Sequence, residues 1–135
     1  MPAPLSGPAR AAWPRFSLVS GALLGFATVA CGALAAHLPD RMLVPGGREM
    51  LRGAVQMQGW HAAALLLIGA LAERQDGWPL RLAAILMLCG IASFCGGVYS
   101  LAFGTTVAGW LAPLGGTLAM VGWLLLAVAA VARRA

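Results

Sequence analysis

Four long apolar segments, separated by short polar connections, make up almost the whole chain. From Phe16 to Ala36 no charged residue interrupts the sequence, and a helix of that length, at about 1.5 Å per residue, covers about 31 Å, the thickness of a bilayer core. Further apolar runs follow Arg52, Arg81 and Thr106. The pattern predicts four membrane-spanning helices over about 16–37, 53–72, 82–103 and 107–132.

The residues before the first apolar segment have a different character. Residues 1–15 contain four prolines and two arginines, a composition that does not sustain a helix, so we predict a disordered tail. An arginine-flanked apolar run near an N-terminus also resembles a cleaved secretory signal. The run from Phe16 to Ala36 exceeds the usual signal core of about 7 to 15 residues, which favours a retained first span. Residues 16–134 then form one membrane domain.

A polar segment leads into the second span. Pro39 ends the first helix, and a Pro–Gly–Gly turn at 45–47 precedes a new helical pattern. Arg48, Arg52 and Gln56 recur every fourth residue on one face of that helix. We interpret the segment as a helix extension at the membrane surface, with its arginines among lipid headgroups. A dedicated lipid or partner site is the alternative.

Composition places the chain among integral membrane proteins, because 61% of its residues are hydrophobic and 10% are charged. The net charge of +5 comes from arginines that flank the apolar segments, so we expect lipid surroundings and no nucleic-acid partner. Six arginines lie in the tail, the second connection and the C-terminus, against three in the first connection. The positive-inside rule therefore predicts that both termini are cytoplasmic.

Small residues recur along one face of three spans, at alternating spacings of four and three residues. Such stripes let helix backbones approach closely. They predict an all-α, four-helix membrane bundle with glycine-rich packing seams. The stripes are Gly21, Gly25, Thr28, Gly32 and Ala35 in the first span, Cys89, Ala92, Gly96 and Tyr99 in the third, and Gly109, Ala112, Gly116 and Ala119 in the fourth.

The second span carries two polar residues on its seam. Gln58 and His61 share one helix face with Ala54, Leu65, Ile68 and Ala72. An unsatisfied polar group is costly inside a bilayer. We therefore expect a neutral His61 that is hydrogen-bonded to a neighbouring helix or to Gln58. A ligand-binding or proton-handling role is the alternative.

His37 lies in the last turn of the first span, where the helix dipole favours a positively charged imidazole. We expect it to cap that helix. Because His37 and His61 both lie toward the membrane side that holds the first connection, a shared site stays open. The candidate residues for a ligand site or polar network are Gln58, His61, Tyr99 and His37.

Reactive groups are sparse. Cys31, Cys89 and Cys95 are odd in number and lie within spans, so we interpret them as small apolar packing residues rather than a disulfide framework. Two histidines with scattered thiols do not make a metal-binding pattern, and no cofactor is expected. No constellation indicates covalent catalysis. The predicted spans contain no Asp, Glu, Lys or Arg, whereas ion pumps usually need one inside the membrane.

Four blocks of the sequence are distinctive. They are "GALAAH" ending at His37, "QGWHAAALLLIG" around His61, "SFCGGVY" ending at Tyr99, and "PLGGTLAMVGWLLL" from Pro113. Together they resemble the YgdD-like family of small bacterial membrane proteins, of UPF0382 type and catalogued as domain of unknown function 423. The resemblance covers nearly the whole chain after the tail.

The chain departs from the family pattern at four positions. Ala35 and Leu38 stand where the family has Gly, Gln56 where it has Arg, and Trp60 where it has Tyr. The missing arginine weakens the case for a shared charged site near Gln58. The resemblance implies a four-helix protein of the bacterial inner membrane, and it implies no established activity, cofactor or catalytic residue.

Two functions fit these observations. The first is a structural or accessory component that packs against larger membrane complexes or against itself, which the glycine seams and the lack of reactive groups favour. The alternative is a binding or transport module for an apolar ligand, such as a quinone, haem or lipid, near Gln58 and His61. An enzyme is the least supported class.

Overall fold

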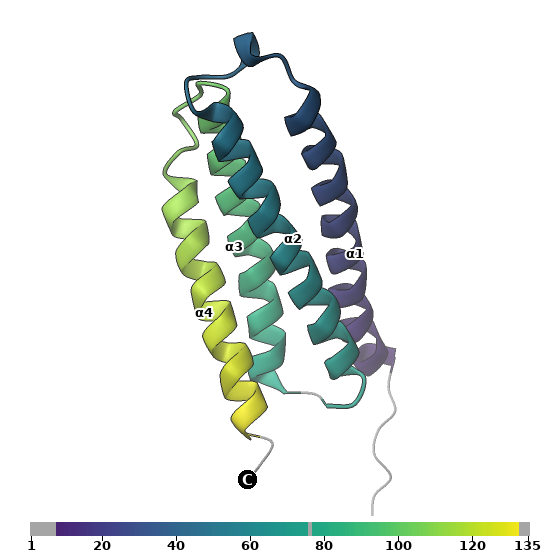
Figure 1. Cartoon of the computed structure of the whole chain (residues 1–135). Coiled ribbons are helices and arrows are strands. Elements are labelled where there is room, and N and C mark those ends of the chain that lie inside the picture. Colours follow the sequence, from purple (N-terminus) through teal and green to yellow (C-terminus); the bar gives the residue numbers. More distant parts are fainter. Residues whose placement is uncertain (1–7, 76, 133–135) are drawn as a thin grey trace, which may run out of the picture.

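The computed structural model describes residues 8–75 and 77–132, and within them the chain is helical without strands (Figure 1). Four helices are long and apolar enough to cross a membrane, so the protein is an all-α, multi-pass membrane bundle. A short 3₁₀ turn, η1 (Asp40–Met42), lies in the first connection. The long helices are α1 (Pro8–His37), α2 (Gly47–Ala72), α3 (Trp78–Ala102) and α4 (Leu111–Val131).

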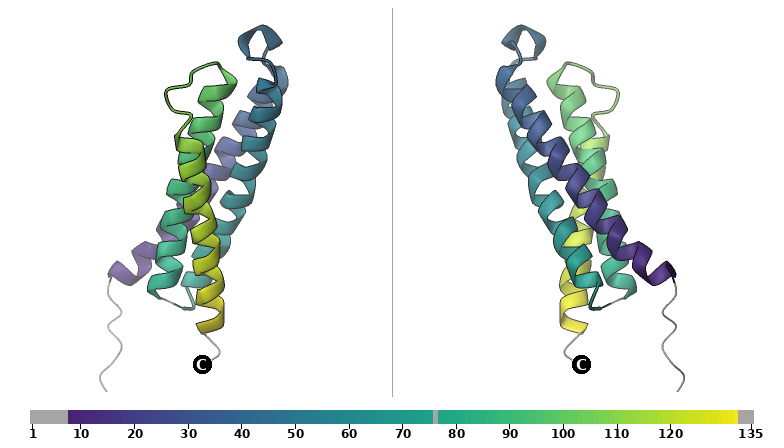
Figure 2. Two further views of the ribbon diagram at one scale, coloured as in Figure 1. Left: turned by 90° about the vertical axis from the view of Figure 1, so that its left-hand side faces the viewer. Right: turned by 90° about the vertical axis from the view of Figure 1, so that its right-hand side faces the viewer.

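The helices form two hairpins that lie side by side. α1 packs on α2, α4 packs on α3, and a smaller contact between α2 and α3 joins the pairs. α1 and α4 therefore lie on opposite sides of the central pair (Figures 1 and 2). The central helices are buried over far more of their length than the outer two. The outer helices consequently present most of the lipid-facing surface.

The first helix begins earlier than the sequence predicted. α1 starts at Pro8, so the prediction of a disordered tail over 1–15 was wrong for 8–15, and residues 1–7 lie outside the described part. Proline is compatible with the first turn of a helix, because the N–H that it lacks has no partner there. Pro14 is accommodated within the helix, one turn before the buried Ser17.

The fourth helix begins later than predicted, at Leu111 rather than near 107. Gly104, with φ of 83°, ends α3, and the Thr105 N–H donates to the Ser100 carbonyl over 2.8 Å, an arrangement typical of helix C-termini. Hydropathy does not change across this turn, so the sequence pattern could not locate the boundary. α2 is continuous from Gly47, which includes the predicted surface extension.

Glycines hold each hairpin together. A Cβ added at Gly90 would lie 2.7 Å from the Ala119 nitrogen, and one at Gly97 would lie 2.7 Å from the Ala112 nitrogen, so α3 and α4 pack backbone to backbone. In the other hairpin, a Cβ at Gly21 would lie 2.9 Å from the Leu66 nitrogen. Only glycine fits such approaches.

The stripe predicted for the third span was wrong by one residue. Gly96 is exposed, and an added Cβ would meet nothing within 4 Å. Cys89 and Ala92 are exposed on the same face. The glycines that contact α4 are Gly90 and Gly97, rotated by about 100° from the predicted stripe. Of the other predicted packing glycines, Gly21, Gly25, Gly32 and Gly116 do have neighbours in the adjoining helix.

Candidate functional site

The seam face of α2 carries two buried polar side chains. Gln58 is 4% exposed and His61 is 2% exposed. The apolar residues predicted to share this face, Ala54, Leu65, Ile68 and Ala72, are all buried as well. The spacing along α2 therefore identified the correct face. α2 lies between α1 and α3, so side chains on this face can reach several helices.

His61 uses both of its ring nitrogens. Nδ1 lies 2.8 Å from the Met57 carbonyl oxygen, one turn earlier in α2. Nε2 lies 3.2 Å from Trp123 Nε1, on α4. A carbonyl can only accept and an indole N–H can only donate, so these partners assign a neutral ring with its proton on Nδ1. The rings meet edge to face, with centroids 6.0 Å apart.

Gln58 links α2 to two other helices. Its Oε1 accepts a hydrogen bond of 2.8 Å from the Tyr99 hydroxyl of α3, and its Nε2 donates to the Leu24 carbonyl of α1 over 3.4 Å. Nearby, the Cys95 thiol donates to the Ala54 carbonyl over 3.4 Å. The sequence placed Gln58, His61 and Tyr99 as candidates, and the structure brings them into adjoining hydrogen-bonded pairs.

Three of these hydrogen bonds cross between the two hairpins. Gln58 to Tyr99, His61 to Trp123 and Ala54 to Cys95 each join α2 to α3 or α4. Interhelical hydrogen bonds of this kind contribute about 0.6 to 2 kcal/mol each. Polar side chains thus join the two hairpins in addition to the buried apolar residues that α2 and α3 share. Gln58, His61 and Tyr99 thus each have hydrogen-bond partners within the chain.

Sequence reasoning missed Ser17, which is fully buried and donates to the Leu65 carbonyl over 2.8 Å. This bond lies within the first hairpin. A serine inside an apolar span is a weak signal, because it can also bond to its own helix. Thr28 does so, donating to the Leu24 carbonyl over 2.8 Å.

The end of α1 is capped by Arg48 rather than by His37. The Arg48 guanidinium donates to the carbonyls of Ala35 and Leu38 and also bonds to Asp40. Ala35 belongs to the last turn of α1 and Leu38 directly follows the helix, where carbonyl acceptors lack intrahelical partners. His37 is exposed there. It does not join His61, which follows the start of α2 by 14 residues, or about 21 Å.

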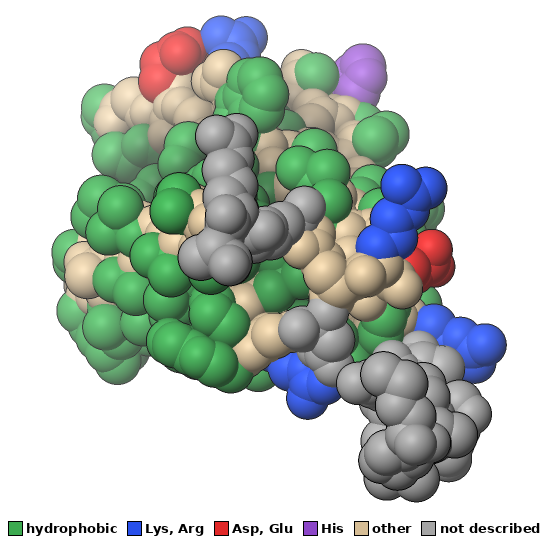
Figure 3. Space-filling model, turned by 90° about the horizontal axis from the view of Figure 1, so that it is seen from below, with side chains coloured by type: hydrophobic (Ala, Val, Ile, Leu, Met, Phe, Trp, Pro, Cys, Tyr) green, Lys and Arg blue, Asp and Glu red, His purple; other side chains and the backbone are tan. Residues whose placement is uncertain are grey.

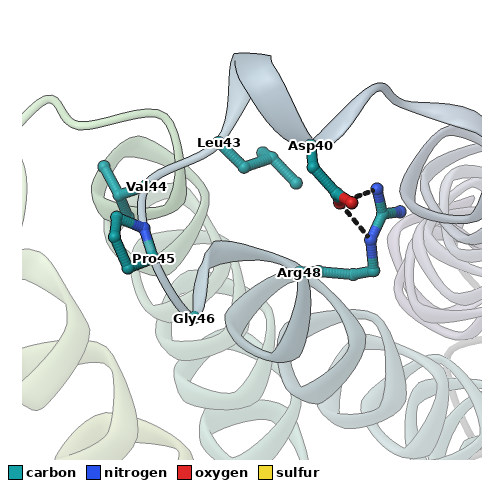
Figure 4. A pocket seen from close by; sticks show the side chains of 6 residues that line it. All are labelled: Asp40, Leu43, Val44, Pro45, Gly46 and Arg48. Carbon is teal, nitrogen blue, oxygen red and sulfur yellow. Dashed lines mark hydrogen bonds and ion pairs between the residues drawn. The ribbon is translucent and has the colours of Figure 1, made fainter.

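Arg48 was expected among lipid headgroups with Arg52, and that interpretation was wrong for Arg48. Its side chain is 24% exposed, whereas that of Arg52 is 61% exposed and pairs with Glu49. A recess of about 350 Å³ lies between the first connection and the start of α2. Figure 4 shows Asp40 and Arg48, which are paired with each other at its lining. The recess is lined by Asp40, Leu43, Val44, Pro45, Gly46 and Arg48.

The family model described as "Protein of unknown function (DUF423)" matches residues 31–116. This range holds the end of α1, all of α2 and α3, the start of α4, and all of the inter-hairpin network except Trp123. The chain belongs to the DUF423 family. This confirms the family resemblance given by the four sequence blocks. No solved structure matches the chain.

Relatives of this DUF423 chain carry the name UPF0382 membrane protein. One from Haemophilus influenzae is 38% identical over 107 residues, covering 78% of this chain and 86% of the relative. YwdK of Bacillus subtilis is 31% identical over 121 residues, covering 84% and 94%. The inner membrane protein YgdD of Escherichia coli is 28% identical over 120 residues, covering 87% and 90%. The DUF423 chain is thus a multi-pass membrane protein.

Proposed function

We propose that the protein is a structural or accessory component of the bacterial inner membrane, which acts by packing against a helix of another membrane protein. One observation carries the proposal. The outer face of α3 presents Cys89, Ala92 and Gly96 as an exposed stripe of small residues. Small residues at this spacing are what close helix–helix contact in membranes requires.

Gly96 distinguishes this stripe from an ordinary lipid-facing surface. A glycine in a helix lowers helix stability by about 1 kcal/mol relative to alanine. At Gly90 and Gly97 the glycine is needed because the backbone of α4 packs closely there. At Gly96, among the described residues, no atom beyond the adjoining helix backbone and chain neighbours comes within 4 Å of an added Cβ. Larger apolar residues, Ile85 and Phe103, border the stripe and are also exposed.

The buried polar residues support a structural role over ligand binding. His61, Gln58 and Tyr99 bond to groups of the chain itself. A quinone, haem or lipid would have to displace one of these bonds to reach them. A purified sample that carries such a molecule, and loses it on a His61→Leu substitution, would favour the ligand function instead.

Photocrosslinking in intact membranes tests the proposal. A photoreactive residue at position 92, on the α3 stripe, should crosslink to a discrete protein band, while one at the exposed position 63 of α2 should not. Gly96→Leu should abolish the band. The matched control is Gly53→Leu, because Gly53 is also exposed without neighbours but lies outside the stripe. Crosslinking to lipid alone at both positions would contradict the proposal.

We further propose that both termini are cytoplasmic. The N-terminal end of α1, the α2–α3 connection and the C-terminal end of α4 lie at one end of the bundle. Figure 3 views this end, where arginine side chains gather along one edge. Arg15, Arg74 and Arg81 are exposed there, which supports this orientation under the positive-inside rule.

A further inference from the structure

Two glutamines of α2 have opposite surroundings. Gln58 is buried and hydrogen-bonded to Tyr99 and Leu24. Gln56, in contrast, is exposed on the outer face of the helix, and among the described residues no hydrogen bond reaches its amide. An amide without a partner is costly in a hydrocarbon environment. The position of Gln56 therefore calls for a partner from the membrane.

Contacts with α1 give the depth of Gln56 in the bilayer. Its neighbour Val55 packs on Gly32 of α1, where an added Cβ would lie 3.5 Å from Val55 Cγ1. Gly32 precedes Ala36, the end of the apolar run of the first span, by four residues, or about 6 Å. Gln56 thus lies just inside the hydrocarbon core, close to the interfacial region that holds the lipid ester groups.

A pair of opposite charges lies one turn nearer the membrane surface. Arg52 precedes Gln56 by four residues, or about 6 Å along the axis. The adjacent Leu51 shares a buried cluster with Ala35, so Arg52 lies at the level where the apolar run of α1 ends. Its guanidinium bonds to Glu49 Oε1 over 2.9 Å, and both side chains are mostly exposed. The outer face of α2 therefore offers one positive and one negative group at headgroup depth.

These side chains form one continuous strip along the helix. Glu49, Arg52, Gln56 and Trp60 are all exposed and fall within about 80° around the axis of α2. Cα–Cβ bonds in a helix lean toward its N-terminus, which for α2 is the end that holds the first connection. The Gln56 amide and the Trp60 indole therefore lean toward the charged pair. We call these four residues the α2 strip.

We propose that the α2 strip binds one molecule of phosphatidylethanolamine, a lipid whose headgroup carries a phosphate and a primary ammonium. The Arg52 guanidinium donates to the phosphate oxygens, which its planar fork of N–H groups matches. Glu49 accepts a hydrogen bond from the ammonium. One turn deeper, the Gln56 amide donates to an ester carbonyl of the lipid, and Trp60 lies along the acyl chain.

Charge complementarity favours this lipid over two other phospholipids. Phosphatidylglycerol has a net negative headgroup without an ammonium, so it would bring its charge beside Glu49 with nothing to pair with that carboxylate. Phosphatidylcholine carries a positive group without N–H donors, so Glu49 could accept no hydrogen bond from it. Among the three, only phosphatidylethanolamine gives Arg52 and Glu49 each an oppositely charged, hydrogen-bonding partner.

Native mass spectrometry of the full chain tests the proposal. The protein is released from nanodiscs that contain phosphatidylethanolamine, phosphatidylcholine and phosphatidylglycerol in equal amounts and with the same acyl chains. Chains that retain one phosphatidylethanolamine should outnumber those that retain either competitor by about two-fold to five-fold, the range for an exposed charge pair. Equal retention of the three lipids, a preference for another lipid, or no retained lipid would overturn the proposal.

Variants assign the preference to the α2 strip. Glu49→Gln should abolish the preference for phosphatidylethanolamine, and Arg52→Gln should lower retention of all three lipids. Gln56→Leu should lower retention without changing the order of preference. Arg41→Gln is the matched control, because Arg41 is exposed in the first connection but lies outside the α2 strip. An equal loss of lipid in this control would show that net charge alone attracts lipid, which would also overturn the proposal.

A second copy of the chain is the competing occupant of the α2 strip. Two Gln56 amides could then pair with each other, and the same spectra would show a lipid-free dimer that Gln56→Leu dissociates. That result would replace the lipid with a protein partner. The unfolding temperature of each variant checks that it is folded. The test does not involve the exposed stripe of α3, so its outcome is independent of the partner-binding function proposed above.

Discussion

The indole N–H of Trp123 donates a hydrogen bond to Nε2 of His61, and this bond joins α4 to α2 near the middle of both helices. The Met57 carbonyl accepts a hydrogen bond from Nδ1, the other ring nitrogen. One neutral tautomer therefore gives both ring nitrogens a partner. The histidine inside the membrane is thus explained by two partners, of which one comes from its own helix and one from the helix farthest along the chain.

Replacing Trp123 with Phe should lower the free energy of unfolding by about 1 to 2 kcal/mol, because it leaves the buried Nε2 of His61 without a donor. Trp60→Phe is the matched control, since Trp60 is 64% exposed, and we expect little change there. Unfolding measured in bicelles checks both. An equal loss in the two variants would show that the bond to His61 does not contribute.

A double-mutant cycle isolates the pair itself. His61→Leu should cost about 1 kcal/mol, and combining it with Trp123→Phe should cost less than the sum of the single changes by about 1 kcal/mol, because both partners are then removed together. Strict additivity of the two changes would mean that the side chains act independently.

The two glycine faces of α3 should respond in opposite ways to alanine. Gly90→Ala should destabilise the bundle by about 1 to 3 kcal/mol, because the new Cβ would lie 2.7 Å from the Ala119 nitrogen and 2.8 Å from the Gly115 oxygen. Gly96→Ala should leave the isolated chain as stable or up to about 1 kcal/mol more stable, since alanine favours the helix. Comparing their unfolding free energies checks this, and a large loss at Gly96 would refute the assignment of that face.

Arg48→Met should destabilise the first hairpin by about 1.5 kcal/mol or more, because charge-assisted hydrogen bonds to the end of α1 are lost. Arg52→Met should change stability by less than about 1 kcal/mol, as its ion pair with Glu49 is exposed. Hydrogen exchange at the C-terminal turn of α1 should accelerate only in the Arg48 variant. Similar exchange in both variants would exclude a capping role for Arg48.

Alkaline phosphatase fused after Ala135 should be inactive, and a fusion within the first connection, after Met42, should be active, because the enzyme requires the periplasm and we place the termini in the cytoplasm. Enzyme activity in intact cells distinguishes the two orientations. An active C-terminal fusion with an inactive loop fusion would reverse the proposed topology.

The sequence by itself determined the four spans and the buried face of α2. Span length follows from the number of apolar residues between charges, which is a local property of the chain. On α2, large apolar residues such as Leu65 and Ile68 share a single face with Gln58 and His61, and the depth of that face in the membrane makes unpaired polar groups costly. Only one rotation of α2 about its axis both buries these apolar residues and turns Gln58 and His61 toward helices that can supply hydrogen-bond partners.

Only the tertiary structure decided which face of α3 is packed. Gly90 and Gly97 form one small-residue stripe, and Cys89 and Gly96 form another one position away, so spacing alone favours neither. The choice depends on which stripe meets the backbone of α4. The partners of His61 and of the α1 carbonyls were likewise unpredictable, because Trp123 is 62 residues distant and Arg48 lies beyond a turn. Such pairings follow from how the helices dock, and a one-dimensional pattern carries no information about docking angles.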